Sequence, residues 1–119
     1  MIEKKTVIDR IEVDRFGFLH VRFGLLLVED GVECGCTWHR SGVEPGGSVD
    51  AMIATVNNDI TTRPALRAAP IDMGRVDELK AIQEIVHTPA RVAAYRRAVL
   101  DAEAADLAAA VSTVERRMV

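Results

Sequence analysis

The clearest hydrophobic pattern in the chain is an alternation of apolar and polar residues on both sides of Asp30-Gly31, between Phe18 and Arg40. This pattern predicts a β-hairpin, because aspartate and glycine tolerate the positive φ of a type I′ turn. A two-residue loop places Glu29 opposite Val32. Continuing the pairing without interruption predicts one apolar face, made of Val21, Phe23, Leu25, Leu27, Cys34, Cys36 and Trp38. The opposite face would then carry Arg22 opposite His39 and Gly24 opposite Thr37.

A preceding strand is predicted from Thr6 to Asp14, with apolar residues on one face. The connection Arg15-Phe16-Gly17 fits a three-residue hairpin loop with glycine in the left-handed position. This loop aligns the apolar faces of the two strands and leaves only Asp9, opposite Phe23, on the wrong side. The apolar pairs are Val13–Leu19, Ile11–Val21 and Val7–Leu25. The three strands, at about residues 5–41, form an antiparallel meander whose apolar face helices, another copy or a partner must cover.

Helical periodicity follows a predicted loop at Ser41–Gly47. One apolar stripe predicts a helix at about 49–59, capped by Ser48 and made of Val49, Met52, Ile53, Val56 and Ile60. Thr61–Gly74 contains two prolines and is predicted to be an extended connection that crosses the sheet or reaches a neighbour. A second helix is predicted at about 75–86, with these residues facing inward: Val76, Leu79, Ile82 and Val86.

A long, alanine-rich helix is predicted from Pro89 to about Arg117, because Thr88 is a good N-cap and no glycine or proline interrupts the run. In its second half, apolar residues alternate at spacings of four and three, as in the a and d positions of a heptad repeat: Leu100, Ala104, Leu107, Val111, Val114 and Met118. Two interpretations stay open. The helix packs on its own sheet, or it packs on a partner or a second copy.

These elements predict an α+β fold, a three-stranded antiparallel β-meander followed by about three α-helices, the last long and Ala-rich. We expect one α+β domain over residues 1–97 and a C-terminal helical extension over 98–119, continuous with the helix that starts at 89. A chain of 119 residues can bury one modest core. Its 49% of hydrophobic and 28% of charged residues are an ordinary globular balance.

The net charge and the hydropathy of the chain argue against two classes of partner, nucleic acids and membranes. The net charge of −3, from 15 basic and 18 acidic residues, argues against a nucleic-acid partner. Apolar runs are far shorter than the ~18 residues of a membrane span. The start, MIEKKTVIDR, lacks the apolar segment of a secretory signal. We therefore expect no membrane or nucleic-acid partner and synthesis in a reducing cytoplasm.

The candidate metal ligands are Cys34, Cys36 and His39, since thiolate and imidazole are the usual ligands of zinc. A structural zinc site uses four ligands, with cysteines separated by roughly two to four residues. In the predicted pairing the cysteines lie on one face, whereas His39 and His20 lie on the other. The favoured interpretation is two reduced, buried cysteines that act as small hydrophobic residues, with no metal and no cofactor.

The candidate catalytic residues lack the neighbouring motifs that a catalytic site needs. His39 and Ser41 lack a nucleophile elbow and an oxyanion site, which a hydrolytic triad needs. Cys36 lies in the predicted apolar face, where burial raises the pKa of a thiol. Pro45-Gly46-Gly47-Ser48 lacks the Gly-Lys-Ser/Thr of a phosphate loop. We therefore expect no enzyme, although a small metal- or thiol-dependent enzyme stays as a remote alternative.

Three pieces of the chain form a familiar pattern when they are taken in order. The first is Ile8–Asp14 with Leu19–Arg22, a strand, loop and strand ending in H-V-R. The second is the E-D-G-x-E hairpin at Glu29–Glu33, followed by Trp38-His39-Arg40 and a Pro-Gly loop. The third is a Thr-Pro-x-x-Val-x-x-Tyr helix, here Val86-His87-Thr88-Pro89 with Val92-Ala93-Ala94-Tyr95. Together, over about residues 5–47 and 75–97, they resemble a family of small proteins encoded in the tail-gene region of tailed bacteriophages.

The chain departs from the family pattern in two places. Pro45-Gly46 is followed by Gly47-Ser48 instead of two aspartates. Residues 49–74 look like an insertion, and residues 98–119 look like an extension. Both additions are apolar-striped or Ala-rich, which suits extra contacts in an assembly.

The resemblance implies a structural component of a bacteriophage virion, most simply a small tail or distal-tail subunit that acts through protein contacts. Its expected partners are other phage tail proteins and copies of itself, and its expected location is the virion. An assembly chaperone of the tail or tail fibre, absent from the virion, is the alternative. The residues expected to make the contacts are Phe23, Leu25, Trp38, Leu100, Leu107, Val111 and Val114.

Overall fold

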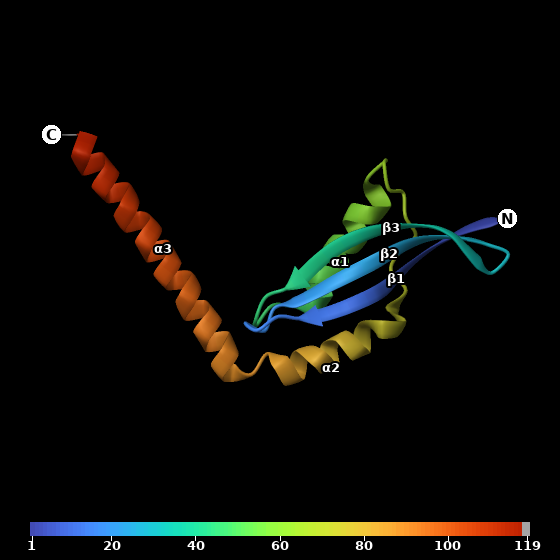
Figure 1. Ribbon diagram of the computed structural model, residues 1–119, viewed down its shortest axis with the longest axis horizontal. Helices are drawn as coiled ribbons and strands as arrows, with labels where there is room; N and C mark the ends of the chain where they lie inside the picture. Colours follow the sequence, from blue (N-terminus) through green and yellow to red (C-terminus); the bar gives the residue numbers. More distant parts are fainter. Residues whose placement is uncertain (118–119) are drawn as a thin grey trace.

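The computed structural model describes residues 1–117 and contains a sheet followed by helices (Figure 1). The elements are β1 (Ile2–Val13), β2 (Leu19–Glu29), β3 (Val32–Val43), α1 (Val49–Thr62), the short 3-10 helix η1 (Met73–Arg75), α2 (Val76–Val86) and α3 (Pro89–Arg117). The strands form one antiparallel sheet in the order β1-β2-β3. The predicted α+β fold, with its three-stranded meander and long last helix, is confirmed.

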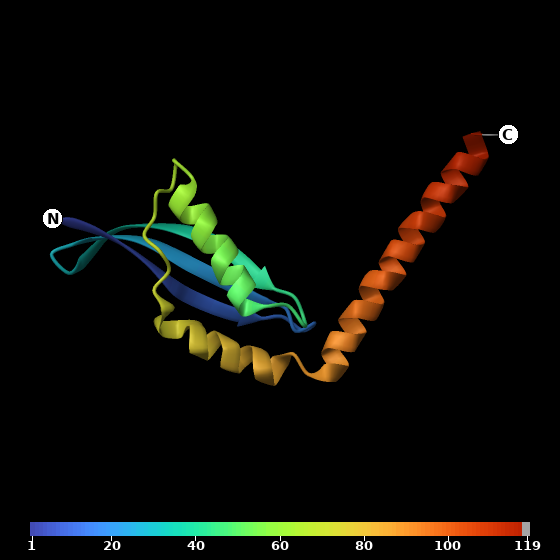
Figure 2. The ribbon, with the colours of Figure 1, turned by 180° about the vertical axis from the view of Figure 1, so that it is seen from behind.

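The core lies between one face of the sheet and the pair of helices α1 and α2. Seen from behind, α1 runs across the sheet and α2 runs beside β1, while no helix of residues 1–117 covers the other face of the sheet (Figures 1 and 2). All five residues of the predicted α1 stripe are buried: Val49, Met52, Ile53, Val56 and Ile60. Val76 and Leu79 of α2 join them, with Ile82 and Val86 partly buried against the core. The apolar sheet face is therefore covered by the chain itself.

Both hairpin turns form as predicted. Asp30 and Gly31 have φ values of 51° and 81°, the positive values that a type I′ turn requires. Glu29 accordingly pairs with Val32. Gly17 has a φ of 91°, which fits the left-handed position of the first loop.

A bulge at Asp9 corrects the predicted pairing of β1. Val13–Leu19 and Ile11–Val21 pair as expected, but the register then shifts between Ile8 and Arg10. Beyond the shift Ile8 faces Phe23, and Thr6, not Val7, faces Leu25. Uninterrupted alternation would have buried the charged Asp9, whereas the extra residue turns Asp9 outward and places the apolar Ile8 in the core.

A second bulge, at Cys34, corrects the predicted pairing of β3. The register shifts between Leu27 and Val28, so that Gly24 faces Trp38 and Phe23 faces His39. The turn fixes one end of this hairpin and the buried Val43 fixes the other, so the odd residue between them must be accommodated by a bulge. As a result, Cys36 and Trp38 lie on the helix-free face, and the prediction that they share the face of Phe23 and Leu25 was wrong.

The remaining boundaries differ modestly from expectation. β1 begins at Ile2 and β3 continues to Val43, so the start of the predicted loop at Ser41–Gly47 is strand. Gly42 suits this strand because a Cβ atom there would lie 2.8 Å from the Leu19 carbonyl oxygen. α1 extends to Thr62, and the hydroxyl of Ser48 accepts a hydrogen bond from the Ala51 amide at 3.1 Å, which confirms the predicted N-cap.

The connection between α1 and η1 crosses the sheet from the end of α1 to the free edge of β1 (Figure 2). Ile71 forms a parallel bridge with Thr6, and the Thr6 hydroxyl donates a hydrogen bond to the Ala69 carbonyl at 2.7 Å. Arg75 then donates to the Ile8 and Asp9 carbonyls, at 2.9 and 3.1 Å, and so ties the start of α2 to the bulge in β1. The last part of the connection therefore lies along the edge of the sheet of its own chain.

Candidate functional site

The residues predicted to make contacts fall into three places. Phe23 and Leu25 are 0% and 8% exposed in the core, where α1 and α2 of the same chain cover them, so these two side chains are not available for contacts with another protein. Trp38 lies on the helix-free face of the sheet and is 48% exposed. The four residues of the last helix are exposed by 48 to 67%: Leu100, Leu107, Val111 and Val114. Two candidate surfaces remain, one on α3 and one on the sheet.

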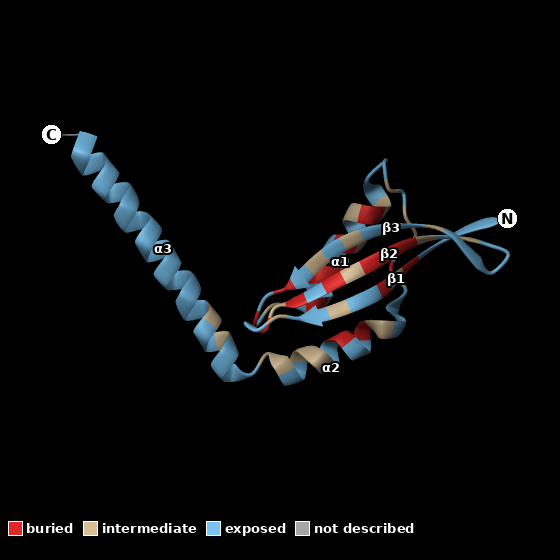
Figure 3. Ribbon diagram, viewed as in Figure 1, coloured by how far each residue is buried: buried red, intermediate tan, exposed pale blue. Residues whose placement is uncertain are grey.

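α3 extends away from the rest of the molecule (Figure 1). The molecule measures 70 × 36 × 20 Å, and α3 forms one end of the longest dimension (Figure 1). Only Val92 and Tyr95, in its first two turns, are partly covered, and every described residue from Arg96 onward is exposed (Figure 3). The interpretation in which α3 packs on its own sheet is therefore contradicted.

We call the exposed apolar stripe of α3, made of Leu100, Ala104, Leu107, Val111 and Val114, the α3 seam. Its residues recur at the a and d spacing, so they lie along one side of the helix. Met118, predicted as the next member, lies outside the described residues. A helix that buries neither face on its own chain keeps this stripe available for another protein.

His87 holds the junction where α2 ends and α3 begins. Its Nε2 atom lies 2.7 Å from the Gly17 carbonyl oxygen. Its Nδ1 atom accepts from the Gly46 amide at 3.3 Å and lies 3.1 Å from Nε2 of Gln83. A neutral ring with the proton on Nε2 satisfies all three contacts. The ring thus joins both loops at that end of the sheet to the helices, a role that the sequence pattern did not predict.

Aromatic packing completes the junction. The rings of Phe18 and Tyr95 meet edge to face with their centroids 5.3 Å apart. Val92 lies against Gly46, where an added Cβ atom would come within 2.9 Å of its side chain. Arg91 packs beside Gly17 on the neighbouring loop. The first turns of α3 are thereby fixed to the body while the seam stays outside it.

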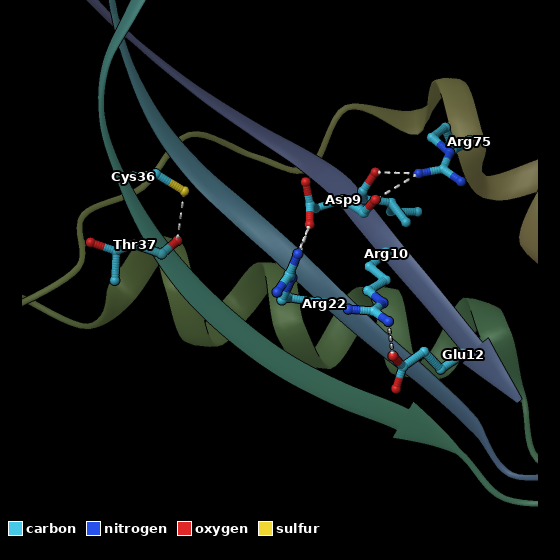
Figure 4. Close-up of polar contacts among 8 residues, drawn as sticks. Asp9, Arg10, Glu12, Arg22, Cys36, Thr37 and Arg75 are labelled. Atoms are coloured by element: carbon cyan, nitrogen blue, oxygen red, sulfur yellow. Dashed lines mark hydrogen bonds and ion pairs between the residues drawn. The ribbon is translucent and has the colours of Figure 1, made fainter. Parts of the chain in front are cut away.

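The helix-free face of the sheet carries a row of three arginines, one from each strand. Arg22 of β2 pairs in register with Arg10 on one side and Arg40 on the other. Arg22 stacks over the Trp38 ring at 4.1 Å from its centroid. It also binds Asp9 at 2.6 and 2.9 Å (Figure 4). Such stacking of a guanidinium on an indole is favourable even at exposed sites.

Carboxylates offset the charge of this row. Arg10 binds Glu12 at 2.7 Å (Figure 4), and Asp14 lies 3.0 Å from His20 in the next row of the sheet. These residues line a shallow hollow of about 350 Å³ together with Arg22, Arg40 and Ser41. Three arginines are matched by three carboxylates, those of Asp9, Glu12 and Asp14, so the face is mixed in charge.

Asp14 is the residue of this face with a perturbed carboxyl group. A hydrogen bond from His20, and further bonds from the Phe16 and Phe18 amides at 2.9 and 3.1 Å, hold the pKa of Asp14 below its usual 3.8. These bonds stabilise the ionised form because each donor points at the carboxylate oxygens. Asp14 therefore closes the first hairpin loop with its side chain.

Cys34 and Cys36 are free thiols and both are exposed, so the prediction that they are buried was wrong. Cys34 is the bulged residue, and its thiol lies 3.4 Å from the Leu27 carbonyl. Partial burial, with Glu33 and Asp9 nearby, raises the pKa of the Cys36 thiol. Among residues 1–117, no group of three or more histidine, cysteine, aspartate or glutamate side chains is close enough to hold a metal ion.

His39 faces the core side of the sheet, where its Nε2 atom lies 3.8 Å from Asp59 of α1. Asp59 also binds Arg63 at 2.7 Å. No hydrogen bond joins His39 to Ser41 within the described part of the chain, so the structure does not bring the two candidate hydrolytic residues together.

Within residues 1–117, no helix is long and apolar enough to cross a membrane. Comparisons of the chain with protein-family models, with curated proteins and with solved structures found no match.

Proposed function

We propose that the protein is a structural component of a bacteriophage virion, a small subunit of the tail or of its distal apparatus. It acts through contacts with other tail proteins and with copies of itself. The proposal gives it no catalytic activity and no metal or cofactor. The observation that carries the contact role is the α3 seam, a regular apolar stripe on a helix that extends away from its own core.

The energetics of the seam favour an association. Leu100 and Leu107 are 64% and 67% exposed, and the seam continues through Val111 and Val114. Burying a leucine or valine side chain that water surrounds is worth roughly 1.5–3 kcal/mol. Four such side chains on each of two paired helices therefore supply a gain of the same order as the roughly 4–15 kcal/mol that association costs.

The assignment to a phage tail comes from the sequence. The order of the hairpin, the strand ending at His39-Arg40 and the Thr88-Pro89 helix resembles small tail-region proteins. The architecture supports a role in assembly, because residues 98–117, which look like an extension of that pattern, form a projecting arm. The other addition, residues 49–74, supplies α1 to the core of the body. A body that is held in place and an arm that binds a neighbour suit a component of a repeated structure.

Mass spectrometry of purified virions tests the proposal. The phage that encodes the chain is grown, and its particles are separated from the lysate by density gradient. The protein should be present in the particles at a stoichiometry comparable to that of other tail subunits. Its presence in the lysate but absence from the particles would instead identify the assembly chaperone described above.

A further inference from the structure

We propose that α3 pairs with α3 of a second copy of this chain in a parallel, in-register, two-stranded coiled coil along the α3 seam. The inference rests on the proposed role of α3 in self-contact and adds the identity, orientation and number of the paired helices. Three independent features of the described chain carry it: the side of the helix that the body uses, the types of residue in the seam, and the charges beside it.

The body holds α3 by the side opposite to the seam. With Leu100 and Leu107 at d positions, Val92 and Tyr95 fall at positions c and f of the heptad, and Arg91 falls at b. Positions b, c and f lie on the outer side of a helix in a coiled coil, away from its partner. Val92, Tyr95 and Arg91 pack against Gly46, Phe18 and Gly17 of the body, and the guanidinium of Arg96, at position g beside the seam, also lies against Gly46. Two copies can therefore pair through their seams with both bodies on the outside.

The residue types of the seam favour two strands. Leu100 and Leu107 occupy d positions and the β-branched Val111 occupies an a position. Leucine at d with valine or isoleucine at a favours parallel dimers over trimers and tetramers. Ala104, the other a residue, lets the two backbones approach closely at that layer.

Charged residues beside the seam select the orientation. In a parallel pair, each g position faces the e position five residues later in the other helix. Arg96 is at g and Asp101 is at e, so a parallel dimer contains two Arg96–Asp101 ion pairs. Neither residue makes an ion pair with any described residue of its own chain, and both are exposed.

Antiparallel pairs lack this advantage. Aligning Leu100 with Val111 of the other helix places Arg96 opposite Arg117, which is repulsive. Aligning Leu107 with Val111 places Glu103 opposite Arg117 but also Asp101 opposite Glu115, so that attraction and repulsion cancel.

Arg97 marks the start of the paired region. It occupies the a position before Leu100, where two arginines would face each other in a parallel pair. The coil therefore begins at Leu100, beyond the turns of α3 that pack on the body. In the single chain the Arg96 guanidinium lies beside Gly46, so the Arg96–Asp101 ion pair forms when this side chain turns from the body toward the second helix.

A charge exchange in the intact chain tests the orientation. Arg96→Glu places two acidic residues together in a parallel dimer, and Asp101→Arg places two basic residues together. Each variant alone should dimerise about tenfold more weakly than the unchanged chain. An equimolar mixture should recover the unchanged affinity, because both ion pairs form again, with reversed sign in one of them. Sedimentation equilibrium measures all four samples, and failure of the mixture to recover would overturn the parallel arrangement.

Disulfide trapping supplies a second measurement that does not depend on the ion pairs. In a Cys34→Ser, Cys36→Ser background, Val111→Cys places two thiols in one a layer of a parallel dimer, and Ala109→Cys places them on the outer side. The Val111→Cys chain should form a covalent dimer at least tenfold faster under mild oxidation. Equal rates for the two variants would contradict an in-register seam. Neither measurement uses virions, so a failure here is distinct from absence of the protein from the particle.

Discussion

His87 shows how one side chain can set the direction of a whole helix. Its ring connects the Gly17 carbonyl, the Gly46 amide and Gln83, which come from two loops and α2. The pattern Val86-His87-Thr88-Pro89 predicted where one helix ends and the next begins. It could not predict these partners, because Gly17 is 70 residues away along the chain.

Replacing His87 should therefore loosen the junction. His87→Ala removes three hydrogen bonds and should lower the free energy of unfolding by about 1–3 kcal/mol. It should also speed hydrogen exchange at the Gly46 amide, which loses its acceptor. Ile85→Ala is the matched control, since Ile85 lies two residues earlier and is 78% exposed. Equal exchange at Gly46 in the two variants would show that the ring does not hold this loop.

The ionisation of Asp14 makes the free energy of unfolding depend on pH. Its pKa is lowered by His20 and by the Phe16 and Phe18 amides, so the folded state favours the carboxylate more than the unfolded state does. This contribution is present above the ordinary value of 3.8 and is lost as the pH falls through the lower folded pKa. Asp14→Asn should therefore reduce stability at about pH 6, and its deficit should shrink in acid. Urea unfolding at a series of pH values measures this, and a deficit independent of pH would contradict the assigned cause.

At the scale of elements, the sequence pattern predicted the three strands and the three α-helices, but it predicted neither the 3-10 helix η1 nor the two bulges. Alternation is a local signal. A bulge, in contrast, forms where the pairing of two strands is fixed at both ends and one strand has an extra residue between those ends. Asp9 was the visible sign of the first conflict, because a charged residue fell in an apolar row. The second had a weaker sign, since Cys36 and Trp38 are apolar and suit either face. The candidate surface on the sheet was therefore misassigned, whereas the seam of α3, which depends on one helix alone, was predicted correctly as an apolar stripe.

The pairing of β3 can be tested at its glycines. A Cβ atom at Gly42 would lie 2.8 Å from the Leu19 carbonyl oxygen, which belongs to the backbone of the central strand. Gly42→Ala should therefore lower the free energy of unfolding by about 1–3 kcal/mol. Gly35→Ala is the control, because its nearest neighbour is the flexible Leu27 side chain at 3.3 Å. If thermal unfolding affects both variants alike, the strands do not approach each other at Gly42 as described.

At the scale of the whole molecule, the chain divides its apolar residues between two uses. The sheet, α1 and α2 bury one core, and the cover for the sheet comes from this chain. The seam of α3 is left outside, on the side of the helix that faces away from the body. Composition and length could predict the first use, because one core is what a domain of this size can form. The second use, the exposed seam, depends on the direction in which α3 leaves the body. Contacts of Gly17, Gly46 and His87 set this direction, and hydrophobic periodicity carries no information about them.

The sedimentation of the purified chain tests the central claim, that α3 is a contact arm for a second copy. The unchanged protein should self-associate as its concentration rises, and Leu107→Asp should be a monomer with an unaltered melting temperature, because Leu107 contacts nothing in its own body. Ala109→Asp, which introduces the same charge on the outer side of α3, should associate normally. A chain that stays monomeric at the highest concentration, or a Leu107→Asp variant that unfolds, would contradict this account of α3.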